Sequence, residues 1–245
     1  MTQQEMIHIV QSQLATDLNC SPDDFSRDGI VFCEAKENPG RRPFPRGERH
    51  FDLLTMGGAA IISATSDIMP YIREQLEGKS RDDAFNAPFV YGIGLWFLPD
   101  SPQPLPLPEG FDFKFTEREG IPVLYAHEGF RHAIQYDVNH PRPDVIVMTA
   151  KKDGLTVGMA GASVDCETMW QIGIDVLPEY RSRSLAGVLT NHLAMEIIKR
   201  GKIPYYATAI GNIASQRTAC RAGFRPAWSG SWRGRFDGEL TEPTS

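Results

Sequence analysis

The sequence predicts a mixed α/β protein, and three observations support this fold class. Residues 144–176 contain three strand-like runs separated by short turns, as in an antiparallel sheet. Strand and helix patterns then alternate up to residue 233, which is typical of an α/β sheet with both parallel and antiparallel pairs. The chain has 245 residues, 41% of them hydrophobic, but no run of about 18 apolar residues, the length that a membrane-spanning helix requires.

The N-terminal part contains both helical and strand patterns. Apolar residues at helical spacing predict a helix over residues 4–18, and Asp67 suits the N-cap of a second helix that reaches about Leu76. Arg41 and Arg42 lie in a turn-rich stretch that predicts a solvated loop. We expect residues 1–98 to form an α/β domain, with strands at 30–34, 51–55, 59–63 and 89–98.

Residues 99–110 hold five prolines within ten residues. Proline lacks the backbone amide that helices and central strands need. We therefore expect an extended connector between two domains. The alternative is a long proline-rich loop inside one domain.

We expect a second domain over residues 111–235, followed by a C-terminal tail of residues 236–245. Its first elements are a helix at 121–138 and a strand at 144–150. A hairpin turn follows at residues 151–154, because Asp153-Gly154 tolerates the positive φ that such turns need. The remaining elements are strands at 155–164 and 169–176, a helix at 181–200, a strand at 202–210, a helix at 213–222 and a final strand at 224–233.

The stretch from Ile174 to Ala186 is the most informative part of the sequence. A buried-type strand ends near a proline, and a loop with small residues and arginines leads into a long helix. Backbone amides at a helix start have no intrahelical acceptor, and the helix dipole favours negative charge there. Small residues let a phosphate approach these amides closely, and the flanking arginines add charged donors. The stretch therefore predicts an anion-binding site.

The same stretch resembles the GNAT superfamily of acyl-CoA-dependent N-acyltransferases. The central motif of that family is V-x-P-x-x-[RQ]-x-x-G-x-[GA]. Val176, Pro178, Arg181 and Ala186 occupy its positions, and Ser184 stands where glycine is usual.

A second family segment, N-x-x-[AS] before a helix that ends in G-F, is matched by Asn212, Ser215, Gly223 and Phe224. The resemblance spans roughly residues 116–235. It implies a mostly antiparallel central sheet that is flanked by helices and split between two strands, with acetyl-CoA as cosubstrate. Residues 1–98 would then be a degenerate second copy of the fold or an accessory domain beside the acceptor.

The resemblance also implies which residues bind coenzyme A. Pantetheine would pair with the backbone of the strand at 169–176, and the pyrophosphate would bind the amides at the start of the following helix. Asn212 would hold the pantetheine arm or order its loop. The implied residues are Ile174, Asp175, Val176, Arg181, Ser182, Arg183, Ser184, Leu185, Ala186, Asn212 and Ser215.

Two catalytic positions that are common in the family are vacant here. The general acid is often a tyrosine seven residues after the asparagine, where this chain has Ala219. The usual positions of the base hold Gly173 and Ile172. The neighbouring Cys220 could be an acid, but we expect a buried apolar role for it.

Three other residues are candidates for the catalytic roles. Asp175 lies in the implied split strand, and Tyr205 and Tyr206 lie on the partner strand. Because side chains alternate along a strand, only one of the two tyrosines can face the cleft. The alternative for Asp175 is a capping or solvated carboxylate, since a base must reach the proton that it takes.

Two functions from different classes fit this sequence. The first is an N-acetyltransferase that transfers acetyl from acetyl-CoA to an amine of a small molecule or protein, directly in a ternary complex. The second is a catalytically weak or inactive GNAT-like module that binds CoA as a sensor or partner surface. We favour the enzyme, because direct transfer depends on positioning and water can replace a side-chain base.

The charge distribution and the cysteines indicate partners and location. The net charge is −6, but residues 177–235 carry +8, residues 1–176 carry −11 and residues 236–245 carry −3. A basic cofactor half suits a phosphate-bearing ligand, and the acidic remainder favours a cationic amine acceptor. We expect no nucleic-acid or membrane partner, and a monomer or homodimer. Four scattered cysteines without metal-ligand spacing predict a cytoplasmic protein with reduced thiols and no metal site.

Overall fold

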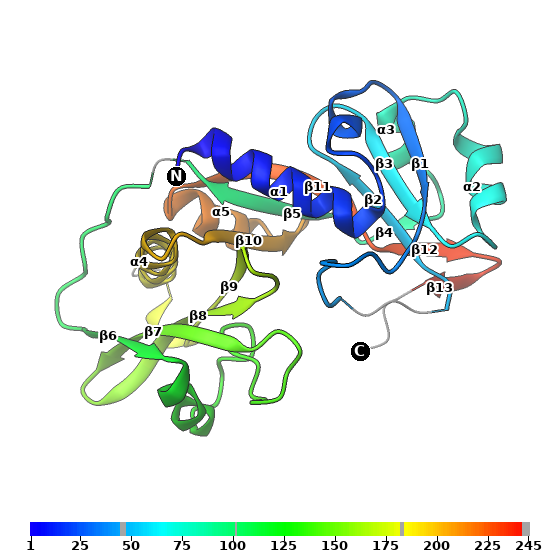
Figure 1. The fold of residues 1–245 in the computed structure, drawn as a ribbon. Helices are drawn as coiled ribbons and strands as arrows, with labels where there is room; N and C mark the ends of the chain where they lie inside the picture. The colour runs from blue at the N-terminus through cyan, green and yellow to red at the C-terminus, as the bar shows by residue number, and fades with distance from the viewer. Residues whose placement is uncertain (45–47, 101, 182–183, 242–245) are drawn as a thin grey trace. The chain divides into compact units, whose positions relative to one another are not determined.

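The computed structural model describes residues 1–44, 48–100, 102–181 and 184–241. Its strands, labelled in Figure 1, are β1 (Ile30–Glu34), β2 (Phe51–Thr55), β3 (Ala60–Ala64), β4 (Val90–Tyr91), β5 (Gly94–Pro99), β6 (Asp112–Glu117), β7 (Asp144–Lys152), β8 (Leu155–Val164), β9 (Met169–Val176), β10 (Ile203–Ala209), β11 (Phe224–Ser231), β12 (Arg233–Phe236) and β13 (Glu239–Thr241). The α-helices are α1 (Gln3–Leu18), α2 (Met69–Leu76), α3 (Arg81–Phe85), α4 (Leu185–Lys199) and α5 (Ile213–Arg221). Three 3-10 helices are η1 (Pro22–Ser26), η2 (Arg118–Ala126) and η3 (Pro178–Tyr180).

The described strands form a large mixed sheet and a small sheet. The large sheet has ten strands in the order β1-β3-β2-β11-β5-β10-β9-β8-β7-β6, and the small one has the order β13-β12-β4. The predicted mixed α/β fold class is confirmed. Among the described residues, no helix is both long and apolar enough to span a membrane.

The chain divides into two compact units, and each is built from separate stretches of sequence. Unit 1 comprises Met1–Met6, Phe97–Ala207 and Asn212–Arg225, and unit 2 comprises Ile7–Trp96, Thr208–Gly211 and Pro226–Ser245. Both implied family motifs belong to unit 1, so the candidate site can be described within that unit.

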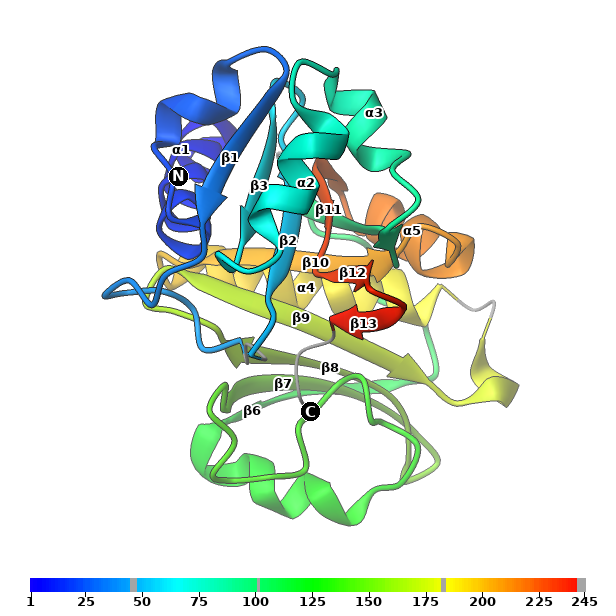
Figure 2. The same cartoon turned by 90° about the vertical axis from the view of Figure 1, so that its right-hand side faces the viewer.

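Unit 1 is a layered structure around β6 to β10. The neighbouring pairs from β6 to β9 are antiparallel, whereas β9 and β10 are parallel. Figure 2 shows α4 on one face of β7, β8 and β9, and η2 on the opposite face. On the η2 face, Ile121, Phe130 and Ile134 pack against Val147 and Met159 of the sheet. Both faces of the strands that carry the candidate site are therefore covered.

The turn between β7 and β8 has the predicted hairpin geometry. Lys152 pairs with Leu155, so the loop consists of Asp153 and Gly154. Both have positive φ, 50° and 81°, as a two-residue hairpin with right-handed strand twist requires. The strands predicted on either side of this turn are confirmed.

The helix predicted over residues 121–138 is wrong. The structure has η2, which contains Pro122, followed by irregular backbone that includes Tyr136 at a φ of 56°. The amides of Ala133 and Gln135 donate to carboxylates on β9 and β7. These tertiary hydrogen bonds take the place of a regular helical ladder.

The proline-rich segment at residues 99–110 is extended where the structure describes it and is fastened to α4. The amide of Leu105 donates to Asn191 Oδ1 over 3.0 Å, and Asn191 Nδ2 donates to the carbonyl oxygens of Gln103 and Ala222 over 3.0 and 3.1 Å. The neighbouring His192 places Nε2 2.7 Å from the carbonyl oxygen of Leu105. One buried amide side chain thus ties three chain segments together.

Asn191→Ala is expected to destabilise the protein by about 2 kcal/mol, because it removes one buried hydrogen bond, to Ala222, and two part-buried ones, to Gln103 and Leu105. Denaturant unfolding measures this change. Arg217→Ala, at an exposed position of α5, is the control and should change stability by less than about 0.5 kcal/mol. Equal stabilities of Asn191→Ala and the wild type would contradict the anchoring role.

Unit 2 is built on a three-strand core. β2 pairs antiparallel with β3, and β1 pairs parallel with β3. Ile62, Ile68 and Ile72 pack with Phe51 and Phe89 in its apolar core. The hypothesis that residues 1–98 are a degenerate second copy of the unit 1 fold stays a prediction.

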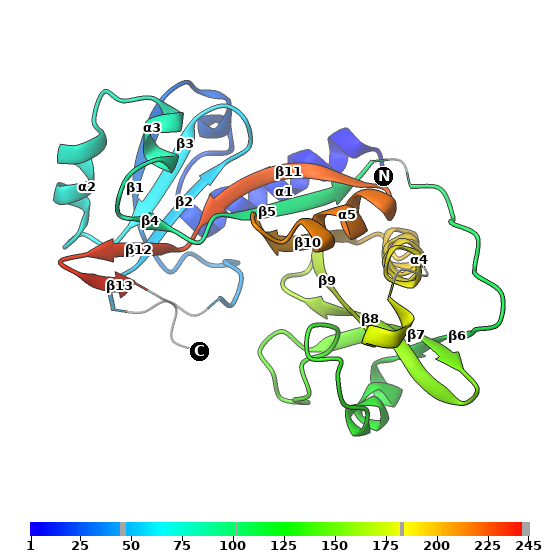
Figure 3. The same ribbon diagram turned by 180° about the vertical axis from the view of Figure 1, so that it is seen from behind.

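Several expected elements of unit 2 differ from the structure. Helix α2 starts after Ile68 without a side-chain cap, and Asp67 instead accepts a hydrogen bond from Arg49 Nε at 3.0 Å. The strand expected at 89–98 is interrupted at Gly92, which has a φ of 65°. The expected final strand is replaced by β11 followed by a β12–β13 hairpin, which pairs with β4 (Figure 3).

The Arg41-Arg42 stretch is not the solvated loop that its charge predicts. Arg42 is buried, and its Nε lies 2.6 Å from Asp17 Oδ2 of α1. The amide of Arg42 also donates to Asp17 Oδ1 over 2.9 Å. Arg41 donates to the carbonyl oxygen of Phe44 over 2.9 Å. The two arginines therefore hold a turn of unit 2 together.

Candidate active site

The strands β9 and β10 separate part of the way along their length. Their parallel pairing runs from Met169 with Ile203 to Ile172 with Tyr206. β9 continues to Val176 while it stays paired with β8, and β10 continues to Ala209. The edge of β9 over residues 173–176 therefore faces a split in the sheet. This is the strand that the family resemblance assigns to pantetheine, with Ile174, Asp175 and Val176 in the split part.

The start of α4 lies close to the end of β9 in the chain. The first described helical hydrogen bond runs from the amide of Val188 to the carbonyl oxygen of Ser184 over 3.1 Å. The amides of Leu185 and Ala186 precede it, so they lack an acceptor within the helix. Arg181 Nε donates to the carbonyl oxygen of Val176 over 3.1 Å, which fastens its side chain at the end of β9. Ser182 and Arg183 lie outside the described residues.

The backbone conformation at Ser184 is one that favours glycine, the usual residue of the family motif. Its φ of 60° and ψ of 2° are left-handed, and its side chain does not cap the helix. A residue with a Cβ atom is disfavoured in this conformation by roughly 1–2 kcal/mol. The chain keeps the backbone turn that leads into α4 although the residue is serine.

The second motif forms the start of α5 and its contact with β10. Asn212 is the N-cap, because its Oδ1 accepts from the amide of Ser215 over 3.1 Å. Ser215 Oγ lies 2.7 Å from the hydroxyl of Tyr206. Burial raises the pKa of Tyr206, and the negative charge of Asp175 raises it further. Tyr206 is thus a protonated phenol, and the charge of Asp175 on the split strand acts on its pKa.

Tyr205 points into a different network. Its hydroxyl donates to Asp165 and lies 3.3 Å from Gln171 Oε1. Arg142 Nη1 donates to the same two side chains over 3.2 and 3.0 Å. This buried network joins β10 to the start of β9. The two tyrosines occupy separate environments, in agreement with their alternation along the strand.

Asp175 accepts three hydrogen bonds from one short segment. The amides of His132 and Ala133 donate to its Oδ2 over 2.7 and 3.2 Å. His132 Nδ1 lies 3.1 Å from its Oδ1. The carboxylate is 17% exposed, and the imidazole is 84% exposed. Asp175 therefore holds a histidine at the edge of the split strand.

Two glycines let this segment lie directly on the sheet. Gly161 of β8 and Gly173 of β9 pair with each other. A Cβ atom at Gly173 would overlap the carbonyl oxygen of His132, and one at Gly161 would overlap that of Ala133. Gly173 occupies one of the two usual base positions of the family. Close approach of the backbone requires glycine there and excludes a carboxylate.

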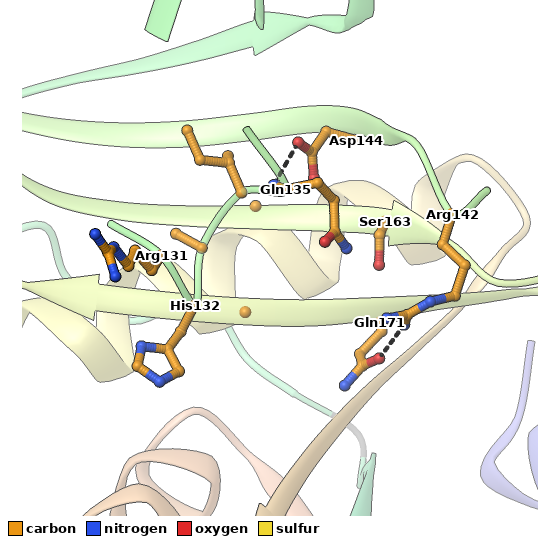
Figure 4. Close-up of a pocket in the computed structure, with 11 residues that line it drawn as sticks. Arg131, His132, Gln135, Arg142, Asp144, Ser163 and Gln171 are labelled. Carbon is orange, nitrogen blue, oxygen red and sulfur yellow. Dashed lines mark hydrogen bonds between the residues drawn. The ribbon is translucent and has the colours of Figure 1, made fainter. Parts of the chain in front are cut away.

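A polar pocket of about 190 Å³ lies above these glycines. Figure 4 shows Arg142 directed toward Gln171, and the carboxylate of Asp144 bonded to the backbone of Gln135 over 2.8 Å. Burial raises the pKa of Asp144. His132 lines the pocket on its other side. The pocket can therefore accept a polar molecule next to the split strand.

Two features of this site, the contact of His132 with Asp175 and the exposure of Cys220, differ from the expectation. His132 was expected on a helix, and its link to Asp175 crosses 43 residues of sequence. A glycine inside a strand often marks close backbone approach, so Gly173 was the available signal. Cys220 was expected to be buried but is exposed.

The split between β9 and β10, followed by the start of α4, resembles the arrangement that the GNAT family motifs imply. Residues 158–233 match the family described as FR47-like protein, which is GNAT-related. This match covers the split strand and both motifs, and it confirms the family resemblance in that part of the chain.

Solved structures with similarity to this chain include GNAT proteins of low identity. A GCN5-related N-acetyltransferase-like protein from Streptococcus suis is 16% identical, with 72% of each chain covered and a TM-score of 0.46. A tandem GNAT protein from the clavulanic acid biosynthesis pathway is 15% identical, with 65% of this chain and 56% of that chain covered and a TM-score of 0.42. AAC(6')-Iy, in complex with a bisubstrate analog, is 18% identical, with 48% of this chain and 92% of that chain covered and a TM-score of 0.38. No curated protein matches the sequence.

Proposed function

We propose that the protein is an N-acetyltransferase that transfers the acetyl group of acetyl-CoA to an amine. The observation that supports this proposal most is the split between β9 and β10, next to the start of α4. Pantetheine would pair with the free edge of β9 at Ile174 and Val176. The acidic character of residues 1–176 favours a cationic amine as the acceptor.

The start of α4 is the proposed site of the pyrophosphate. The amides of Ser184, Leu185 and Ala186 would donate to the pyrophosphate, and the dipole of α4 would favour its negative charge. Arg181 is exposed, and its hydrogen bond to Val176 leaves the terminal nitrogens for the phosphates. Ser182 and Arg183 complete this site in the proposal.

Tyr206 is the proposed general acid for the thiolate leaving group. Its raised pKa keeps the phenol protonated, and a protonated group is what the departing sulfur needs. The hydroxyl of Tyr205 already serves Asp165 and Gln171, which makes Tyr205 the weaker candidate. Ala219, at the usual acid position, is fully buried and has no proton to give.

A thiol-release assay over a broad panel of amines tests the proposed activity. Acetyl-CoA supplies the thioester, and calorimetry measures CoA binding in the same preparation. Release of free thiol that depends on an amine, with formation of the acetylated amine by mass spectrometry, supports the proposal. Tight CoA binding without turnover on any amine contradicts it.

That second result would support a CoA-binding module without catalysis. This alternative is favoured by the absence of titratable side chains at Ala219 and Gly173, two of the family's usual catalytic positions. Ala219 is buried, and the backbone of His132 fills the space that a side chain at residue 173 would need. A module of this kind would keep CoA affinity while variants at Tyr206 changed nothing measurable.

The double variant Arg181→Glu with Ser184→Asp is expected to weaken CoA binding by about 100-fold. It changes the local charge by three units, at about 1 kcal/mol per unit in a solvated site. Calorimetry measures the affinity. The control is Lys199→Glu at the far end of α4, which should change the affinity by less than about threefold. Unchanged binding by the double variant would refute the phosphate site.

A further inference from the structure

We propose that His132 is the general base of the reaction and that Asp175 positions it. The inference rests on the proposed acetyltransferase function. It assigns the base to a loop residue outside the usual strand positions of the family. His132 would be the catalytic residue, because its imidazole would contact the acceptor amine.

The hydrogen bonds of Asp175 fix both the place and the orientation of the imidazole. Two backbone donors, at 2.7 and 3.2 Å, hold the segment at His132 and Ala133 on β9. The third contact joins His132 Nδ1 to Asp175 Oδ1 at 3.1 Å. A carboxylate beside Nδ1 selects the tautomer with its proton there. The lone pair of Nε2 is then available to take a proton.

The position of His132 is suited to an acceptor that meets a thioester in the split. Asp175 lies within residues 173–176 of β9, beyond the last residue that pairs with β10. His132 also lines the polar pocket, together with Gly173 and Gln171. Figure 4 shows its imidazole extending past β9, away from the part of the pocket that holds Asp144. The imidazole therefore lies at the edge of the split strand, at the end of the pocket that is away from Asp144.

Gly173 explains both why the usual base position of the family is vacant and why His132 can lie next to it. A carboxylate at residue 173 would need a Cβ atom, which would overlap His132. The same absence of a side chain lets the backbone of His132 reach β9. The chain thus replaces a strand carboxylate with a histidine from the segment that covers the strand.

His132 Nε2 takes one proton from the acceptor ammonium, and the neutral nitrogen attacks the thioester carbonyl carbon. A C–N bond forms, and the C–S bond then breaks. The nitrogen loses its second proton to solvent, and the departing thiolate gains one from Tyr206, which is reprotonated from solvent. His132 releases its proton to solvent, so the products are the amide, CoA thiol and one proton.

Other charged and titratable groups surround this site. Arg131 is adjacent on the same segment, and Arg142 and Asp144 line the pocket from the β7 side. Burial raises the pKa of Tyr136 and of Tyr206, and Asp175 adds to both shifts. An imidazole base makes kcat/KM fall on the acid side as it becomes protonated. Both tyrosines act on the alkaline side, so they do not produce this decline. Burial raises the pKa of Asp144, so this carboxylate is a second acid-side group, and the decline is assigned to His132 by its loss in a His132 variant.

The test compares His132→Gln with the wild type, using acetyl-CoA and the panel amine that the wild type turns over fastest. We expect kcat to fall about 100-fold or more, with CoA affinity and melting temperature unchanged. Asp175→Asn should lower kcat in the same way, because its amide favours the other tautomer. His8→Gln, at an exposed position of α1, is the control and should keep full activity.

Two further measurements separate a base from a structural residue. With aminoacetonitrile, whose amine is largely uncharged at neutral pH, the loss in His132→Gln should shrink to less than about tenfold. Added imidazole should restore activity to His132→Ala. The acid-side decline of kcat/KM should disappear in His132→Gln.

The outcomes distinguish the two proposals. A wild type without turnover on any amine overturns the proposed function and the base with it. An active wild type with an equally active His132→Gln variant overturns the base alone. An equal loss with charged and uncharged amines, without rescue by imidazole, also overturns the base and leaves acetyl transfer intact.

Discussion

Gly173→Ala is expected to lower the free energy of unfolding by about 3 kcal/mol, at the upper end of the usual cost of overpacking, and to abolish acetyl transfer. The added methyl group would overlap the carbonyl oxygen of His132 and lie 2.8 Å from its carbonyl carbon. These are backbone atoms and cannot move aside by a change of rotamer. The segment must lift from β9, which breaks its hydrogen bonds to Asp175.

Denaturant unfolding measures the stability of Gly173→Ala, and the thiol-release assay measures its activity. The control is Gly211→Ala, because a Cβ atom there has open space around it. This control should change stability by less than about 0.5 kcal/mol. A Gly173→Ala protein with wild-type stability would show that the segment at His132 does not lie against the strand.

Asp17→Ala is expected to destabilise the protein by about 3 kcal/mol, because it leaves the buried guanidinium of Arg42 without its carboxylate. The ion pair is short at 2.6 Å, and the two side chains are only 12% and 8% exposed. Thermal and denaturant unfolding measure the loss.

A second variant tests whether the unpaired charge causes this effect. Adding Arg42→Met to Asp17→Ala removes the stranded cation and should recover at least about 1 kcal/mol. Lys36→Ala, which disrupts an ion pair with Glu34 whose side chains are 57% and 56% exposed, should cost less than about 1 kcal/mol. A double variant that is less stable than Asp17→Ala would contradict the explanation.

The strands of unit 1 and helix α4 could be predicted because their signals are local. The bounds of β8 and β9 agree with the prediction, since apolar runs there are bordered by turns. The motif residues Asn212 and Ser184 also lie at the helix starts where the resemblance places them. Patterns of this kind depend on neighbours a few residues apart.

The features that sequence reasoning missed depend on distant partners. Residues 127–138 carry apolar residues at suggestive spacing, yet carboxylates on β7 and β9 determine their backbone. The sequence around Arg42 predicts a surface charge. Its hydrogen bond to Asp17, which lies 25 residues away in the sequence, is seen only in the structure. Tertiary hydrogen bonds outweigh local preference in both places.

The discontinuous make-up of unit 2 determines when that unit can be completed during synthesis. Strand β2 pairs with residues 229–231 of β11, and β4 pairs with β12. These partners leave the ribosome well over a hundred residues after the strands that need them. Until then, one side of β2 is an unpaired strand edge, which is a template for wrong association. The nascent N-terminal half must therefore wait for the end of the chain, so separate expression of residues 1–98 would yield an incomplete sheet.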